Sequence, residues 1–93
     1  MTKKTSSASI ADLKGLGPKS AQALADIGVV ELQQFLDSDP FELYASLKLR
    51  SPSVSLNFIY AMIGAQQNIH WQQVRREMKE EILLRLDDLG LAP

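Results

Sequence analysis

The stretch that decides the fold is residues 10–28, which read IADLKGLGPKSAQALADIG. Two glycines, Gly15 and Gly17, bracket one leucine between two short segments with apolar periodicity. Because glycine lacks a Cβ, it adopts backbone angles closed to other residues. We therefore expect both glycines to take such angles and Leu16 to turn into the core. Pro18 is expected at the first position of the next helix, where its missing N–H costs nothing.

The second helix of this hairpin is predicted to present the free N–H groups of its first turn at the surface. Those donors and the helix dipole favour an anion such as a DNA phosphate. The candidate contact residues lie in the turn and at the helix start, and they are Lys14, Gly15, Leu16, Gly17, Lys19 and Ser20. The alternative is a purely structural hairpin that joins helices or holds a partner protein, because a fold does not by itself fix a function.

Capping signals and apolar periodicity predict an all-α, compact domain of five to six helices over residues 9–93, after a flexible arm at residues 1–8. The predicted helices span residues 9–13, 18–27, 30–37, 40–49, 54–67 and 73–89. Gly28 and Asn68 are expected to end two of them in left-handed backbone. The apolar side chains of the third helix (Leu32, Phe35 and Leu36) and of the last (Val74, Met78, Ile82, Leu86 and Leu89) are expected to face the core.

Composition limits the function. The 93 residues fit one domain, and the chain has no cysteine, so disulfides and thiolate metal sites are ruled out. Its longest apolar stretch, residues 58–65, is far shorter than the roughly 20 residues that cross a bilayer. We expect a cytoplasmic protein without a membrane partner. The formal net charge of −1 means that any nucleic-acid binding must be local and weak.

No paired carboxylates, nucleophile triad or phosphate loop stands at a workable spacing. The sequence therefore predicts no enzyme, no cofactor, no metal site and no small-molecule substrate. His70 is the only histidine; we expect a packed residue with one hydrogen bond, with a pH-sensing role as the alternative. Trp71 is interpreted as a core anchor for the last helix. Gly64, inside an apolar helix, costs about 1 kcal/mol relative to alanine, which predicts close approach of another helix.

Each of two charged segments has two possible interpretations. Residues 50–54 (RSPSV) are interpreted as plain capping of the helix that follows by Ser51 or Ser53; contact of a second phosphate through Arg50 is the alternative. The last helix carries three cations and several carboxylates. A solvated face with pairs such as Arg76–Glu80 is expected there, and a protein-docking face is the alternative. The three cations are Arg75, Arg76 and Lys79.

The hairpin resembles the helix-hairpin-helix motif of many DNA-handling proteins. That motif is apolar-x-x-apolar-x-Gly-apolar-Gly followed by a helix with an early alanine, and its positions are filled here by Ile10, Leu13, Gly15, Leu16, Gly17 and Ala21. Over residues 9–88 the chain is also similar to the C-terminal domain of the TfoX (Sxy) family. The similarity lies in LKGLGPKSA, in IGV at 27–29, in PSVSLNFIYAMIGA at 52–65 and in His70-Trp71.

The family resemblance implies a bacterial regulator of natural competence, not an enzyme, that acts with the cyclic-AMP receptor protein at promoters of DNA-uptake genes. It covers only the C-terminal domain of such regulators. Residues 25–36 have a fainter similarity to the C-terminal domain of the RNA polymerase alpha subunit, which also touches DNA and activators through hairpins. The sequence thus predicts an accessory module that contacts DNA weakly through its backbone and a protein partner elsewhere. A protein-interaction or dimerisation module is the alternative.

Overall fold

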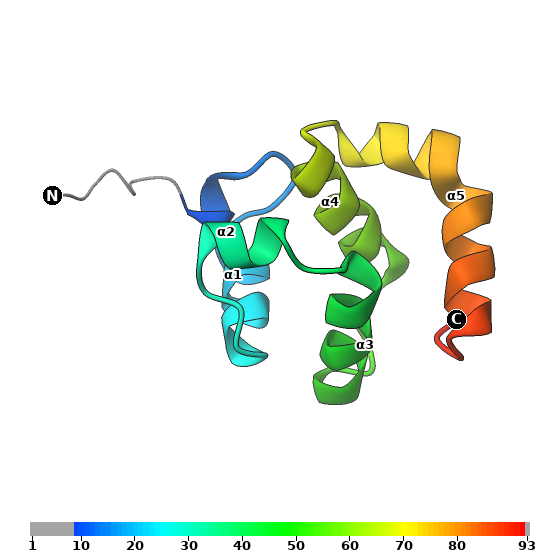
Figure 1. Ribbon diagram of the computed structural model, residues 1–93, viewed down its shortest axis with the longest axis horizontal. Coiled ribbons are helices and arrows are strands. Elements are labelled where there is room, and N and C mark those ends of the chain that lie inside the picture. The colour runs from blue at the N-terminus through cyan, green and yellow to red at the C-terminus, as the bar shows by residue number, and fades with distance from the viewer. Residues whose placement is uncertain (1–8, 93) are drawn as a thin grey trace, which may run out of the picture.

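The computed structural model describes residues 9–92, so the predicted flexible arm at residues 1–8 lies outside them. The described residues form one 3-10 helix and five α-helices, with no strand among them (Figure 1). The elements are η2 (Ile10–Asp12), α1 (Pro18–Asp26), α2 (Leu32–Leu36), α3 (Pro40–Arg50), α4 (Leu56–Gln67) and α5 (Trp71–Asp88). The predicted all-α fold with a hairpin near its start is confirmed.

The hairpin helices begin and end where their local chemistry dictates. The predicted helix at 9–13 is one 3-10 turn, and the backbone N–H of Ser9 donates to the Asp12 carboxylate at 3.1 Å. The next helix, α1, begins at Pro18, as predicted. It ends before Gly28, whose φ of +89° is left-handed. The N–H of Val29 then bonds back to the Leu24 carbonyl at 2.9 Å, which is the hydrogen bond of a Schellman ending.

Local side-chain hydrogen bonds set where the next two helices begin. α2 is shorter than predicted at its start, because the Gln34 side chain accepts the N–H of Val30 at 3.1 Å outside the helix. Leu36 is 36% exposed, so its predicted burial is wrong, whereas Phe35 is fully buried. α3 begins after Asp39, whose carboxylate accepts the N–H of its second residue at 2.8 Å. The Asp-Pro pair in the sequence predicts this cap, because aspartate is a favoured N-cap residue and proline suits the first position of a helix.

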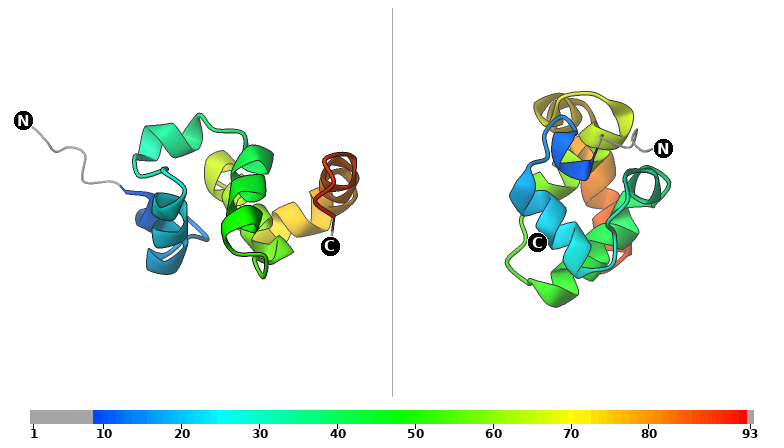
Figure 2. Two further views of the ribbon diagram at one scale, coloured as in Figure 1. Left: turned by 90° about the horizontal axis from the view of Figure 1, so that it is seen from below. Right: turned by 90° about the vertical axis from the view of Figure 1, so that its left-hand side faces the viewer.

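The central element is α4, which lies between the hairpin on one side and α5 on the other in both views of the long axis (Figures 1 and 2). Ile59, Met62 and Ile63 are buried along it. It begins after Ser55, two residues later than predicted, and neither Ser51 nor Ser53 is its N-cap. It ends at Asn68, whose φ of 59° and ψ of 43° confirm the predicted left-handed stop.

The last helix starts earlier than predicted and is bent. It begins at Trp71 because the His70 Nδ1 accepts the N–H of Gln72 at 3.1 Å. His70 is exposed, so its expected packing is wrong, whereas the expected hydrogen bond is present and caps the helix. Figure 1 shows the first turns of α5 crossing the end of α4 and the later turns running down beside α3. Leu89 lies beyond the helix and is 50% exposed, so its predicted place on the inner face is wrong.

Contacts with the start of α3 hold the second half of α5. The Arg85 guanidinium lies 3.6 Å from the Asp39 carboxylate and 4.8 Å from the ring centre of Phe41. α5 contains neither proline nor glycine. Its bend therefore lacks the two residue types that most often kink a helix. The inner face of α5 includes the buried side chains of Val74, Ile82 and Leu86.

Gly64 explains how α4 and α5 approach each other. A Cβ at this position would lie 2.6 Å from the Ile69 carbonyl oxygen and 3.3 Å from the Trp71 nitrogen. The expected close approach is thus present, but the neighbour is the connecting turn and the first residue of α5. A packed helix face was predicted instead. The chain folds back so sharply after Asn68 that its own backbone covers the last turn of α4.

Candidate nucleic-acid interface

The turn between η2 and α1 is closed by Gly15 and Leu16. Gly15 has a φ of +85°, which is the left-handed region that glycine occupies without strain. The N–H of Leu16 donates to the Leu13 carbonyl at 3.1 Å, and the Leu16 side chain is 9% exposed. Both predictions for these two residues are confirmed. Because Leu16 points into the core, it can meet a ligand only through its backbone.

Gly17 differs from the prediction. Its φ of −148° and ψ of −169° are ordinary extended backbone, so the expectation of angles closed to other residues is wrong here. A Cβ on Gly17 would meet no atom of the described chain within 4 Å. Neither backbone strain nor internal space therefore demands glycine at this position. What the glycine does provide is a bare N-cap, with no side chain over the first turn of α1.

The first turn of α1 keeps backbone donors free. Pro18 has no N–H, and the N–H of Ala21 is the first to close a helical bond, to the Gly17 carbonyl at 2.9 Å. In many helices a serine, threonine or aspartate at the N-cap accepts a hydrogen bond from an N–H group of the first turn. No side chain does so here. The N–H groups of Lys19 and Ser20 are thus left for an external acceptor.

The charges around this turn favour an anion. The side chains of Lys14 and Lys19 are exposed, one on each side of the turn in the sequence. The neighbouring acid Asp12 already accepts hydrogen bonds from the backbone N–H and the hydroxyl of Ser9, at 3.1 and 3.2 Å. Asp26, at the far end of α1, lies 4.0 Å from the Arg50 guanidinium. The turn itself therefore has an excess of positive charge.

A shallow hollow of about 350 Å³ adjoins the turn. Its lining contains no charged residue and consists of Gly15, Ser20, Ser55, Asn57, Phe58, Ala61 and Trp71. Of the six predicted contact residues, Gly15 and Ser20 line this hollow. Sequence reasoning did not place Ser55, Asn57 and Trp71 next to the hairpin, because they come from α4 and α5 and only tertiary packing brings them there. The Trp71 ring would lie 3.9 Å from a Cβ on Gly15.

Comparison with known proteins identifies the family. The model of the TfoX C-terminal domain matches residues 6–86. The chain belongs to the TfoX C-terminal domain family. A crystal structure of an uncharacterized protein from Listeria monocytogenes, in a triclinic form, has the same fold, with a TM-score of 0.77 and 22% sequence identity over 92% of this chain and 99% of that one. No curated protein matches the sequence.

The second turn of this TfoX C-terminal domain, between α3 and α4, is built differently from the hairpin. The N–H of Val54 donates to the Ser51 carbonyl at 2.9 Å, and the Lys48 ammonium donates to the Pro52 carbonyl at 3.3 Å. Arg50, the candidate for a second phosphate, is turned toward Asp26 at 4.0 Å. Capping by Ser51 or Ser53 is wrong, because Ser55 is the N-cap residue of α4.

The described part of the TfoX C-terminal domain holds neither a cluster of metal ligands nor a membrane-spanning helix. Within residues 9–92, no three side chains of the His, Cys, Asp and Glu types gather as metal ligands would. In the same part of the chain, no helix has the length and apolar character needed to cross a bilayer.

Proposed function

We propose that this TfoX C-terminal domain is a non-enzymatic accessory module of a cytoplasmic bacterial competence or transcription regulator, and that its hairpin contacts DNA phosphates without reading sequence. The observation that carries the proposal is the bare N-cap at Gly17. It leaves the N–H groups of Lys19 and Ser20 open between two exposed lysines. Phosphate oxygens are suitable acceptors for such donors. The family supports the regulatory setting, and a protein partner is expected at another surface.

The magnitude fits an accessory role. Two to four phosphate contacts give a slope of log K against log salt of only about −2 to −4, and phosphate contacts carry no base specificity. A domain with a formal net charge of −1 would then bind duplex DNA with a Kd of about 10⁻⁴ M or weaker. Binding at such a level becomes useful when a second protein holds the domain near the DNA.

The test is an amide chemical-shift titration with a short DNA duplex near 50 mM salt. We expect shifts at Gly15, Gly17, Lys19 and Ser20, and weaker binding in a Lys14→Ala/Lys19→Ala variant. A sharper variant is Gly17→Asp, because the site has room for a side chain and the extended backbone of an N-cap. Its carboxylate would cap α1 and so maintain the melting temperature, while it occupies the donors and repels phosphate. The charge-matched control is Ser46→Asp, on exposed α3 surface.

A second candidate function is a protein-interaction module whose hairpin is only structural. It is favoured by exposed leucines on the outer surface, of which Leu84 is 68% and Leu49 is 87% exposed. In that case DNA would leave the amides of Gly15, Gly17 and Lys19 unshifted even at low salt. The Gly17→Asp variant would then have no binding phenotype.

A further inference from the structure

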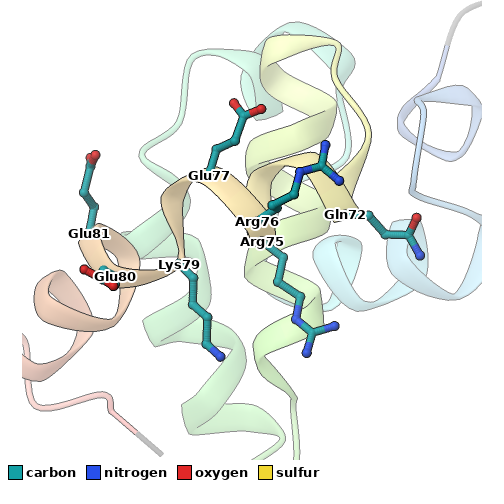
Figure 3. Close-up of a pocket in the computed structure, with 7 residues that line it drawn as sticks. All are labelled: Gln72, Arg75, Arg76, Glu77, Lys79, Glu80 and Glu81. Carbon is teal, nitrogen blue, oxygen red and sulfur yellow. The ribbon is translucent and has the colours of Figure 1, made fainter.

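The first half of α5 carries cations and carboxylates around one shallow hollow, which is lined by Gln72, Arg75, Arg76, Glu77, Lys79, Glu80 and Glu81 (Figure 3). In Figure 3, the side chains of Arg75 and Lys79 point in one direction, and those of Glu77 and Glu81 point in the opposite one. All four residues are exposed. The ion pairs present within residues 9–92 are Asp26–Arg50 and Asp39–Arg85. The expected Arg76–Glu80 pair is therefore not formed, and the carboxylates of α5 do not neutralise its cations by direct contact.

The side that carries Arg75 and Lys79 is continuous with the hairpin. Trp71, the first residue of α5, lines the same hollow as Gly15, and its ring would lie 3.9 Å from a Cβ built on that glycine. Residues four apart on a helix are stacked on one side, so Arg75 lies one turn beyond Trp71 and Lys79 two turns beyond it. Between the hairpin and α5 lies the hollow, which has no charged residue in its lining and hence no acid that would repel a phosphate chain.

We infer that Arg75 and Lys79 form a second anchor for the sugar-phosphate backbone of the same duplex. This inference rests on the proposed function of the hairpin. One helical turn advances about 5.4 Å, and phosphates of one DNA strand advance about 3.4 Å along the axis. Two long cationic side chains one turn apart can therefore reach phosphates one or two steps apart. The duplex would run from the amides of Lys19 and Ser20 across the hollow to α5.

The second anchor doubles the expected salt dependence. Two phosphates neutralised by Lys14 and Lys19 give a slope of about −1.8, and four give about −3.6. Between 50 and 200 mM salt, the first slope lowers the association constant about 12-fold and the second about 150-fold. The two cases are easily separated by fluorescence anisotropy of a labelled duplex of about 20 base pairs.

The experiment compares two neighbouring arginines that differ in direction. Arg75→Gln removes a charge from the proposed anchor, and Arg76→Gln removes the same charge from a side chain that points away from Arg75 in Figure 3. We expect Arg75→Gln to reduce the salt slope by about 0.9 and Arg75→Gln/Lys79→Gln to reduce it by about 1.8. Arg76→Gln should leave the slope unchanged. Amide shifts on addition of duplex should include Gln72, Arg75 and Lys79.

The outcomes separate the inference from the proposed function. If Lys14→Ala/Lys19→Ala weakens binding but Arg75→Gln and Arg76→Gln are indistinguishable, the second anchor is wrong and the hairpin contact stands. If the lysine pair has no effect and the hairpin amides do not shift, the proposed function is wrong as well. If polyglutamate shifts the amides of Arg75 and Lys79 more strongly than duplex DNA does, this side of α5 is a site for an acidic protein, and the inference is overturned.

Discussion

Gly64 provides the most direct test of the packing, because two large effects act in opposite directions there. In the interior of an ordinary helix, glycine to alanine stabilises by about 1 kcal/mol. At Gly64 the added Cβ would lie 2.6 Å from the Ile69 carbonyl oxygen and 3.4 Å from the Trp71 Cα. Both atoms belong to the backbone of a tight turn and cannot move aside as a flexible side chain could. We therefore expect Gly64→Ala to destabilise the domain.

The magnitude follows from the geometry. Relief of the contact requires the turn to shift, and overpacking of this kind costs about 1–3 kcal/mol or more. The same shift weakens the 2.9 Å bond from the Ile69 N–H to the Gly64 carbonyl, a loss of about 1 kcal/mol. After the gain in helix propensity of about 1 kcal/mol, the net loss is about 1–3 kcal/mol. For a domain of this size, that lowers Tm by about 5–20 °C.

The assay is thermal and urea unfolding, followed by far-UV circular dichroism and by the fluorescence of Trp71, which adjoins the turn. The matched control is Asn57→Ala on the same helix. Asn57 is exposed in the first turn of α4, so the substitution gains about 0.5 kcal/mol of helix propensity without a clash. A Gly64→Ala variant that melts at or above the native temperature would refute the close approach of the turn.

Three further predictions concern the core and the caps. Burial, and to a lesser degree Tyr60, raises the pKa of Tyr44. The protonated Tyr44 therefore contributes to the free energy of unfolding. This contribution is complete below the unfolded pKa of about 10 and is lost as the pH rises through the folded pKa. Tyr44→Phe should therefore lose less urea resistance than the native chain between pH 9 and pH 11. Gln66→Ala should cost about 1–2 kcal/mol in urea unfolding, because its amide donates to two carbonyls at the end of α2, at 2.9 and 2.8 Å. Asp39→Ala should lower the free energy of unfolding by about 1 kcal/mol, because it removes the cap of α3. Arg85→Gln should lower it much less, because the ion pair of Arg85 with Asp39 is half exposed. Equal losses in the two variants would show that the ion pair matters as much as the cap.

The parts of the fold that could be predicted from the sequence are those that local chemistry decides. Gly15 and Gly28 take positive φ, Pro18 opens a helix and Asp39 caps one. Each of these needs only two to four neighbouring residues to take effect, so a single sequence is enough to predict it. The same holds for Asn68, whose short polar side chain tolerates the left-handed region. The family match over residues 6–86 agrees with the resemblance found in the sequence.

The errors lie where tertiary packing decides. The sequence around His70 does not distinguish a packed imidazole from a helix cap. The cap depends on the turn at residues 68–70, whose backbone packs over Gly64. Apolar periodicity also placed Leu36 and Leu89 in the core, although both are partly exposed. Periodicity predicts which side of a straight, regular helix faces the core. α2 has only five residues, and α5 bends and ends before Leu89, so the prediction fails at these positions. The hollow shared by Trp71 and Gly15 brings together residues 56 positions apart, and no local signal in the sequence predicts it.

This long-range arrangement changes how the net charge bears on binding. A formal net charge of −1 predicts a weak interaction with DNA when the charges are spread evenly. Here Trp71 and Gly15 line one hollow, and we infer that Arg75 and Lys79, one and two turns beyond Trp71, act on the same phosphate backbone as the lysines of the hairpin, while Glu77 and Glu81 point the other way. Since screening limits exposed charges to a range of about 8–10 Å, a phosphate at the hairpin is governed mainly by the near side. The direction in which charges point is then a better guide to affinity than their sum, which is what the comparison of Arg75→Gln with Arg76→Gln measures.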